Sequence, residues 1–361
     1  MVVGAQPGGA EGRRTRRPAS GRREIALRTA GRQQMETGSF DALTPDAAAF
    51  GVESAYGLRL DGTLIPYPSY INRVYGLRDE EEREYVVKFY RPGRWPAEAI
   101  RDEHAFLSDC AEADLPVACP VKDPEGETLE ELVLEEEGEP RYLFALFPKM
   151  GGRNFDPESD EQWLRLGALA GRMHRAARQR DAQHRAMCHP DLTAGFVKEL
   201  IDEEVVHPEL AGQFEELCAE TLERIRPLFS GLVLQRLHGD LHRGNILDRP
   251  GTGLLLFDFD DMMMGPAVQD LWLLLPGLRK DSGRELSILL EGYEQFADFD
   301  RSMLSLIEPL RFMRMVYFLA WRARQREDYW FQSSFPDWGS KPFWIKEIED
   351  LHDQARVIGD A

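Results

Sequence analysis

The stretch LHGDLHRGNILDRPGTGLLLFDFDD, from Leu237 to Asp261, decides how we interpret the fold and chemistry of this sequence. It places polar and charged side chains between short apolar runs that favour burial. The segments NIL and LLLF predict a β-hairpin across the turn DRPGTG. That pairing would bring Asn245 and Asp258 to the same end of the ribbon, while Asp240 lies upstream in a loop, where its carboxylate is free to accept a proton.

These three side chains together indicate phosphoryl transfer. The Asn245 oxygen and the Asp258 carboxylate are hard donors that suit Mg²⁺, which keeps waters and phosphate oxygens as its other ligands. A carboxylate that orients the attacking hydroxyl, with Asn and Asp on the metal, forms the set that kinases use. We therefore predict an ATP- and Mg²⁺-dependent phosphotransferase. Its catalytic residues are Asp240 and Asp258, and its metal ligands are Asn245 and Asp258.

Each part of this pattern also has another interpretation. The pair Asp258 and Asp260 is similar to the DxD of metal-dependent sugar transferases, and paired carboxylates also serve glycosidases. His238 and His242 are four residues apart, as in helical zinc sites, but Gly239 disfavours a helix there. The full pattern of Asp-x4-Asn followed by a strand and Asp258 is more specific to phosphoryl transfer than any of its parts.

Lys88 is the candidate cation for the phosphates of ATP, and it lies in the strand-like run YVVKFY. Burying an unpaired ammonium is costly, so this lysine either faces solvent or has a partner. Glu103 falls on one helical face with Ile100 and Leu107 in the segment that follows. Because a Lys–Glu pair positions the nucleotide in kinases, we predict that Lys88 and Glu103 pair.

Two further residues complete the predicted site. The sequence has neither a Walker A motif nor a GxGxxG loop, and YPSYINRVY occupies the place of that loop. Ser69 in this segment could offer a hydroxyl and a backbone N–H to phosphate, or be an ordinary turn serine. Asp270 in GPAVQDLW is predicted to be a buried carboxylate that accepts backbone N–H bonds from the loop around Asp240.

The pattern of apolar residues changes once along the chain. From about Tyr56 to Pro148 it is strand-like with one helix, and after Gly152 it is helical. Pro and Gly punctuate the change. We therefore predict an α+β, bilobal fold, with a small β-rich N-lobe over residues 35–148 and a larger helical C-lobe over residues 149–361.

Residues 1–34 differ from the rest of the chain. They hold eight Arg and no Lys, and their only acidic residues are Glu11 and Glu24. Such a segment cannot bury enough apolar surface to fold alone, so we predict a disordered basic leader. Two alternatives are an Arg-rich targeting peptide and an upstream extension that is absent from the mature protein, with Met35 as the start.

Composition narrows the function classes. The net charge of −19 argues against a nucleic-acid partner and against an anionic membrane surface. The four cysteines form no CxxC pair, which indicates reduced thiols in a cytoplasmic protein. No apolar run approaches the roughly 18 residues of a membrane helix, and the nearest candidate, Phe312–Trp321, carries Arg314. We expect a monomer.

Several blocks resemble a known family. HGDLHRGNIL, DFDD and GPAVQDLW resemble the aminoglycoside phosphotransferase and choline kinase superfamily. SYINRVYGL, YVVKFYRPGRW and IEPLRFMRMVYFLAW are similar to the stress response kinase A family, and the likeness runs from about Asp41 to Val357. This resemblance implies a protein-kinase-like bilobal fold and serine/threonine protein kinase activity.

The resemblance also implies roles for individual residues. It supports Asp240 as the proton acceptor and Asn245 and Asp258 as magnesium ligands. Ser69, Lys88 and Glu103 would lie in the ATP site. Phe147 would lie at the hinge between the lobes, where backbone groups meet adenine.

The phosphate acceptor stays open at the level of residues. Only eight residues, Met262–Gln269, separate DFDD from Asp270, so the long activation segment of protein kinases is missing. A small hydroxylated metabolite is therefore as plausible an acceptor as a protein serine, and only the family resemblance favours protein. The alternatives are a small-molecule kinase of the aminoglycoside, choline or homoserine type, and an inactive ATP-binding scaffold.

Overall fold

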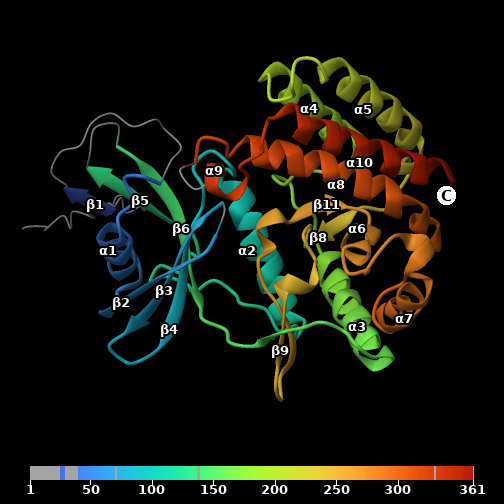
Figure 1. Cartoon of the computed structure of the whole chain (residues 1–361). Coiled ribbons are helices and arrows are strands. Elements are labelled where there is room, and N and C mark those ends of the chain that lie inside the picture. The colour runs from blue at the N-terminus through green and yellow to red at the C-terminus, as the bar shows by residue number, and fades with distance from the viewer. Residues whose placement is uncertain (1–24, 29–39, 70, 136–138, 329–330, 361) are drawn as a thin grey trace, which may run out of the picture.

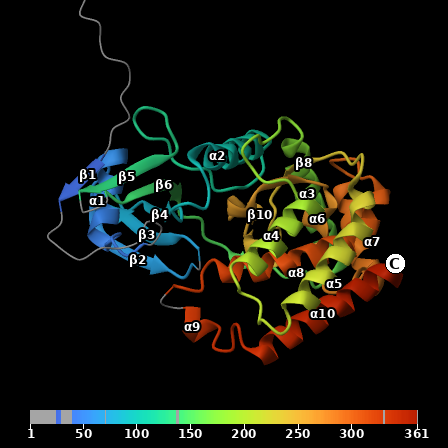
Figure 2. The same cartoon turned by 90° about the horizontal axis from the view of Figure 1, so that it is seen from above.

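A computed structural model describes residues 25–28, 40–69, 71–135, 139–328 and 331–360 of the chain. A curled β-sheet, with helix α1 packed beside it, forms one part of the molecule, and a helical remainder forms the other (Figures 1 and 2). The predicted α+β, kinase-like fold is confirmed.

The sheet has six strands in the order β1-β5-β6-β4-β3-β2, and all neighbours except β1 and β5 are antiparallel. Strand β4 pairs with both β3 and β6, and β5 also pairs with β6. Lys88 thus lies in the middle of the sheet, between Val74 and Ala145. The strands after β1 are β2 (Leu60–Tyr67), β3 (Arg73–Asp79), β4 (Glu84–Phe89), β5 (Glu130–Glu135) and β6 (Arg141–Pro148).

Four residues of the predicted leader lie beside the sheet. Ile25–Arg28 form strand β1, which pairs in parallel with β5. The composition of the leader predicts only that it cannot fold by itself. It does not exclude pairing with the edge of an existing strand, which offers unpaired backbone N–H and C=O groups. The remaining leader residues and the candidate start at Met35 lie outside the described residues, as does part of the acidic turn between β5 and β6.

Helix α2 (Ala97–Glu112) joins the sheet to the helical part (Figure 1). Its predicted inward face is buried. Ile100 packs with Tyr90 and Ala145 of the sheet, while Phe106 and Leu107 belong to the large core of the helical part. Helix α1 (Pro45–Tyr56) closes a separate core on the sheet.

The helical part contains short strands and helices of varied length. The four cysteines of the chain, of which Cys110 lies in α2, form no disulfide. None of the helices in the described ranges combines the length and apolarity needed to cross a bilayer. The α-helices are α3 (Asp160–Ala177), α4 (Pro190–Asp202), α5 (Ala211–Ile225), α6 (Val268–Trp272), α7 (Gly283–Tyr293), α8 (Ile307–Ala323), α9 (Phe331–Ser334) and α10 (Lys341–Asp360). The short strands are β7 (Arg153–Asn154), β8 (Gln235–Leu237), β9 (Ile246–Arg249), β10 (Gly253–Leu256) and β11 (Met263–Gly265). The 3-10 helices are η1 (Arg226–Phe229), η2 (Arg243–Asn245), η3 (Phe259–Asp261), η4 (Arg279–Asp281) and η5 (Arg301–Leu306).

Glycines allow α3 and α7 to pack with their backbones almost in contact. A Cβ on Gly167 would lie 1.9 Å from the Leu289 carbonyl oxygen, and one on Gly171 would lie 2.4 Å from the Tyr293 carbonyl oxygen. No side chain fits at these positions without separating the helices. The contact matters for the site below because α3 carries His174, whose imidazole lies 3.0 Å from the Tyr293 hydroxyl.

We expect Gly167→Ala to lower the free energy of unfolding by about 1–3 kcal/mol, because the added methyl overpacks the α3–α7 contact. Gly195→Ala is the matched control. Gly195 is exposed in α4 and a Cβ there meets nothing within 4 Å, so alanine should stabilise by up to about 1 kcal/mol. Urea unfolding measures both. Equal midpoints for the wild type and Gly167→Ala would contradict the packing described.

Candidate active site

The predicted hairpin forms from β9 and β10, with Ile246 opposite Leu256. Just beyond this pair, the Phe257 N–H donates to the Asn245 carbonyl oxygen at 3.3 Å. Asn245 and Asp258 therefore flank the same end of the ribbon. The loop His238–Asn245, called the HGD loop below, leads into this end.

Asp270 on α6 anchors the HGD loop, as the sequence predicted. Its fully buried carboxylate accepts the backbone N–H of His238 at 2.8 Å and that of Gly239 at 2.9 Å. A third contact joins it to the His174 Nε2 at 2.9 Å. A buried carboxylate needs this many donors to offset its desolvation, so the loop and α6 hold each other in place.

Gly239 is required by the path of the loop. Its φ is +83°, and a Cβ there would lie 1.9 Å from the Asp261 carbonyl oxygen. Both the left-handed backbone and the close approach exclude a side chain. The glycine of HGD thus lets the loop run against the segment that follows the hairpin.

Asn245 is oriented by the loop itself. Its side-chain Nδ2 donates to the Asp240 carbonyl oxygen at 2.9 Å and lies 3.4 Å from the Asp240 Oδ2. With its nitrogen held in this way, the amide presents its oxygen to other ligands. Asp258 lies across from it with a left-handed backbone (φ 61°, ψ 64°), a conformation that costs energy for a non-glycine residue and often marks functional positions.

Lys88 contacts the carboxylates beyond the hairpin rather than Glu103. Its Nζ lies 3.1 Å from Asp258 and 3.3 Å from Asp260. Although burial opposes the charge, Asp260 and Asp258 raise the pKa of Lys88, so the ammonium is charged. The side chain is thus a partly buried cation that joins the sheet to the end of the hairpin.

No direct ion pair joins Lys88 to Glu103 in the described part of the chain, although both residues line the same cavity and the charge of Glu103 acts on Lys88. Glu103 instead accepts from the Arg185 Nη2 at 2.7 Å, and both side chains are buried. Arg185 also donates to the Ala99 and Asp260 carbonyl oxygens, so one guanidinium ties α2 to η3. This partner lies 82 residues from Glu103 and left no local signal in the sequence.

Four of the predicted nucleotide-site residues line one cavity of about 340 Å³, called the lysine cavity here. Asp258, which follows the hairpin, also lines this cavity. Ser69 accepts the Asn72 N–H at 3.3 Å, and Phe147 lies on β6 opposite Val86. The four residues are Ser69, Lys88, Glu103 and Phe147.

A second cavity of about 260 Å³, the aspartate cavity, adjoins the first through Ser69 and Asp258 and contains Asp240. The Asp240 Oδ1 accepts from Arg314 of α8. Burial opposes ionisation of Asp240, but the contact with His242 and the charge of Arg314 lower its pKa below the ordinary value. Asp240 is therefore an ionised carboxylate that faces an open space.

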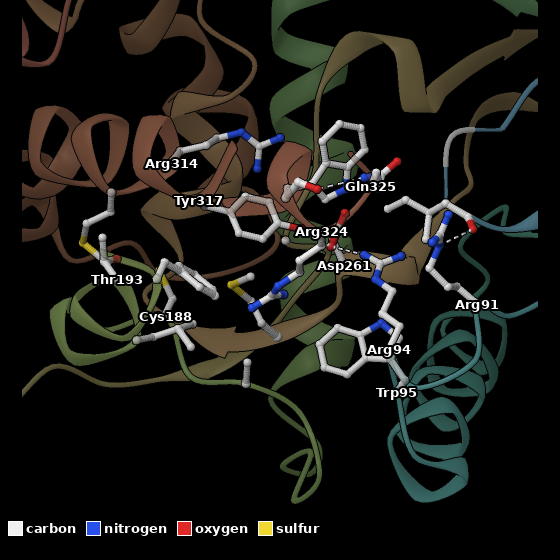
Figure 3. Close-up of a pocket in the computed structure, with 18 of the residues that line it drawn as sticks. Arg91, Arg94, Trp95, Cys188, Thr193, Asp261, Arg314, Tyr317, Arg324 and Gln325 are labelled. Carbon is white, nitrogen blue, oxygen red and sulfur yellow. Dashed lines mark hydrogen bonds and ion pairs between the residues drawn. The ribbon is translucent and has the colours of Figure 1, made fainter. Parts of the chain in front are cut away.

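A third cavity of about 640 Å³, the arginine cavity, continues from the aspartate cavity along α8 (Figure 3). Arg314 and Tyr317 line both cavities, and Asp261 lies at their junction. The Tyr317 hydroxyl donates to Asp261 at 2.9 Å, and Arg94 donates to it at 2.6 Å. Three connected cavities thus surround the HGD loop.

Sequence reasoning missed several polar residues of this site. Asp260 is buried and contacts Lys88, Arg94 and the Asn72 amide, which donates at 3.0 Å. Burial opposes it, but Arg94 and Lys88 hold the pKa of Asp260 well below its ordinary range. Arg314 could have been identified from the sequence, because an arginine within an apolar helix requires an acidic or polar partner.

The donor set fits a magnesium ion better than zinc. Among the described residues, no three His, Cys, Asp or Glu side chains are close enough together to hold a metal on their own. His238 contacts the Phe257 carbonyl through Nε2 and the Asp240 N–H through Nδ1, so both ring nitrogens are engaged. Asn245 and Asp258 supply the oxygen ligands that Mg²⁺ takes, alongside phosphate oxygens and water.

Comparisons with known proteins agree with this geometry. The model of the phosphotransferase enzyme family matches residues 63–340. The chain is 38% identical over 325 residues to stress response kinase A of Escherichia coli (strain K12), covering 89% of this chain and 95% of that protein. It is 37% identical to the serine/threonine protein kinase RdoA of Salmonella typhimurium, covering 84% and 90%. The solved amicoumacin kinase hAmiN, in complex with AMP-PNP, Ca²⁺ and Ami, has a TM-score of 0.68 at 19% identity, covers 86% of this chain and 93% of its own, and shares the fold.

We expect Asp270→Asn to lower the free energy of unfolding by about 3 kcal/mol, because an amide N–H₂ would face a backbone N–H in a buried position. Thermal unfolding measures the change. Asp300→Asn is the matched control, since Asp300 caps the Ser302 N–H at 2.9 Å and Asn caps as well as Asp. Equal losses in the two variants would mean that Asp270 is not an anchor.

Proposed function

This chain belongs to the phosphotransferase enzyme family, and on that premise we propose that it is an ATP- and Mg²⁺-dependent kinase of protein serine and threonine. One observation carries the proposal. Asp258 lines two adjoining cavities, of which one also contains Lys88 and the other contains Asp240, so that a nucleotide in the first can meet a hydroxyl in the second.

The lysine cavity is the proposed ATP site. Lys88 would neutralise the phosphates, and Ser69 would offer its hydroxyl and backbone N–H to them. Phe147 would lie beside the adenine at the hinge, and Glu103 would act on the site through its pair with Arg185. This placement makes residues 35–148 the nucleotide-covering lobe and residues 149–361 the catalytic lobe. The cytoplasmic location and the monomeric state stay predictions.

The aspartate cavity is the proposed place of transfer. Asp240 is ionised, so it can accept a hydrogen bond from the acceptor hydroxyl and then its proton. Asn245 and Asp258 would hold the metal, which would supply positive charge to neutralise the phosphates. Lys88 lies 3.1 Å from Asp258, so the phosphate-binding cation and the proposed metal ligand are already adjacent. The protein thus contributes position and charge rather than covalent chemistry.

The name of one relative, serine/threonine protein kinase RdoA, supports a protein acceptor. The short segment between the hairpin and Asp270 forms β11, which pairs with β8. Because it is short and paired, this segment cannot bind an extended peptide as the long activation segment of protein kinases does. We therefore place the entry of a protein substrate at the arginine cavity.

We expect Asp240→Asn to reduce phosphate transfer at least about 100-fold while ATP binding persists, because an amide cannot accept the proton. Transfer is followed with radiolabelled ATP and a protein substrate, and binding is followed by calorimetry. Asp258→Ala is the contrasting variant, and it should lose Mg²⁺-dependent ATP binding. Asp248→Asn, on the hairpin tip, should leave both measurements unchanged. Near-full transfer by Asp240→Asn would refute its role.

A small-molecule kinase is the second candidate, and the size of the arginine cavity favours it. At about 640 Å³ this cavity falls in the range that holds metabolites. A panel of hydroxylated metabolites and proteins, each incubated with the enzyme and radiolabelled ATP, separates the two functions. We expect label in protein serine or threonine. Label confined to a soluble metabolite would replace the first candidate with the second.

A further inference from the structure

The arginine cavity is lined by more cationic than acidic side chains, although each of its arginines is paired with a carboxylate. The protein carries a net charge of −19, yet among the described residues that line this cavity there are four arginines and one carboxylate, Asp261 (Figure 3). We propose that this cavity selects a serine or threonine whose neighbours in the substrate are acidic, an inference that rests on the proposed kinase function. The arginines are Arg91, Arg94, Arg314 and Arg324.

Arg324 is the best placed of the four to bind an acidic side chain. It follows α8, donates from Nε and Nη2 to Glu199 at 2.6 Å each, and its guanidinium lies over the Phe196 ring. These contacts hold it rigidly, while its side chain remains 52% exposed. Nη1 has no partner in the described part of the chain, so its N–H groups remain for a ligand.

Arg91 offers a second donor at the sheet side of the cavity. Its Nε donates to the Ile71 carbonyl oxygen at 3.2 Å and its Nη2 to Asp328. Nη1 is again without a partner among the described residues. Arg91 and Arg324 thus supply fixed N–H donors for carboxylates at a distance from Asp240.

The cavity offers much less to a cationic acceptor. Its one carboxylate, Asp261, already accepts from Arg94 and from the Tyr317 hydroxyl. Trp95, Phe196 and Trp321 form much of the remaining wall, and apolar walls strengthen whatever charge contacts are made. An amine entering this cavity would meet guanidinium groups first, whereas a carboxylate would meet unpaired donors.

The geometry also gives the spacing in the substrate. Arg314, beside Asp240, lies on α8, and Arg324 directly follows that helix ten positions later, which corresponds to about 15 Å at 1.5 Å per residue. An extended peptide spans about 3.4 Å per residue, so about four residues cover this distance. The acidic side chain should therefore lie about four residues from the phosphorylated serine.

Three synthetic peptides test the proposal. They share one serine and differ only in the residue four positions to either side, which is Glu, Gln or Lys. The full-length enzyme should use the Glu peptide with a kcat/KM about tenfold above that of the Lys peptide, because one charge contact in a partly desolvated site is worth about this factor. The gain should appear mainly in KM.

Arg324→Glu should abolish or reverse this preference. Arg326→Glu is the matched control, because Arg326 also pairs with a glutamate of the α4 region, Glu203, at 2.8 Å but does not line the cavity. It should keep the wild-type preference. If repulsion from Glu199 unfolds Arg324→Glu, Arg324→Gln removes the charge without adding one and should still reduce the preference.

The outcomes separate the two proposals. Equal use of all three peptides, a preference for Lys, or an equal effect of the Arg324 and Arg326 variants would overturn this inference and leave the kinase function standing. No label in any peptide, with label in a soluble hydroxylated metabolite, would overturn both.

Discussion

The buried carboxylate of Asp270 is the constraint on which the rest of the site depends. It accepts two backbone N–H groups of the HGD loop and contacts His174, which is itself positioned by Tyr293 where α3 and α7 pack through their glycines. A charge buried this deeply is tolerated only because these donors converge on it. The loop that carries Asp240 is thus fixed in position by contacts with the core of the helical part.

The second half of the site comes from the sheet. Lys88 on β4 reaches Asp258 and Asp260, and Arg94 reaches Asp260 and Asp261 from the segment before α2. These contacts join residues about 170 positions apart. Cations from one part of the molecule and carboxylates from the other therefore meet at the end of the hairpin. A bound triphosphate needs the cations, and its metal ion needs the carboxylates.

The features that could be predicted from the sequence are those encoded by residues close together in the chain. The hairpin, the HGD loop and the anchoring by Asp270 lie within one stretch of the chain, and periodicity placed Glu103 on the buried face of α2. It did not predict the Glu103–Arg185 pair or the Arg314–Asp240 contact, because the partners are 82 and 74 residues apart and only the tertiary fold brings them together. For the same reason the arginine cavity, assembled from six separate segments, left no local pattern in the sequence, and strand β1 left none because its partner strand, not its own composition, stabilises it.

A crystal structure with Mg²⁺ and a non-hydrolysable ATP analogue tests the central claim most directly. The account predicts the triphosphate in the lysine cavity, with Lys88 on the phosphates, the metal on Asn245 and Asp258, and the terminal phosphorus facing Asp240 across the aspartate cavity. A nucleotide bound elsewhere, or one whose terminal phosphate points away from Asp240, would contradict it.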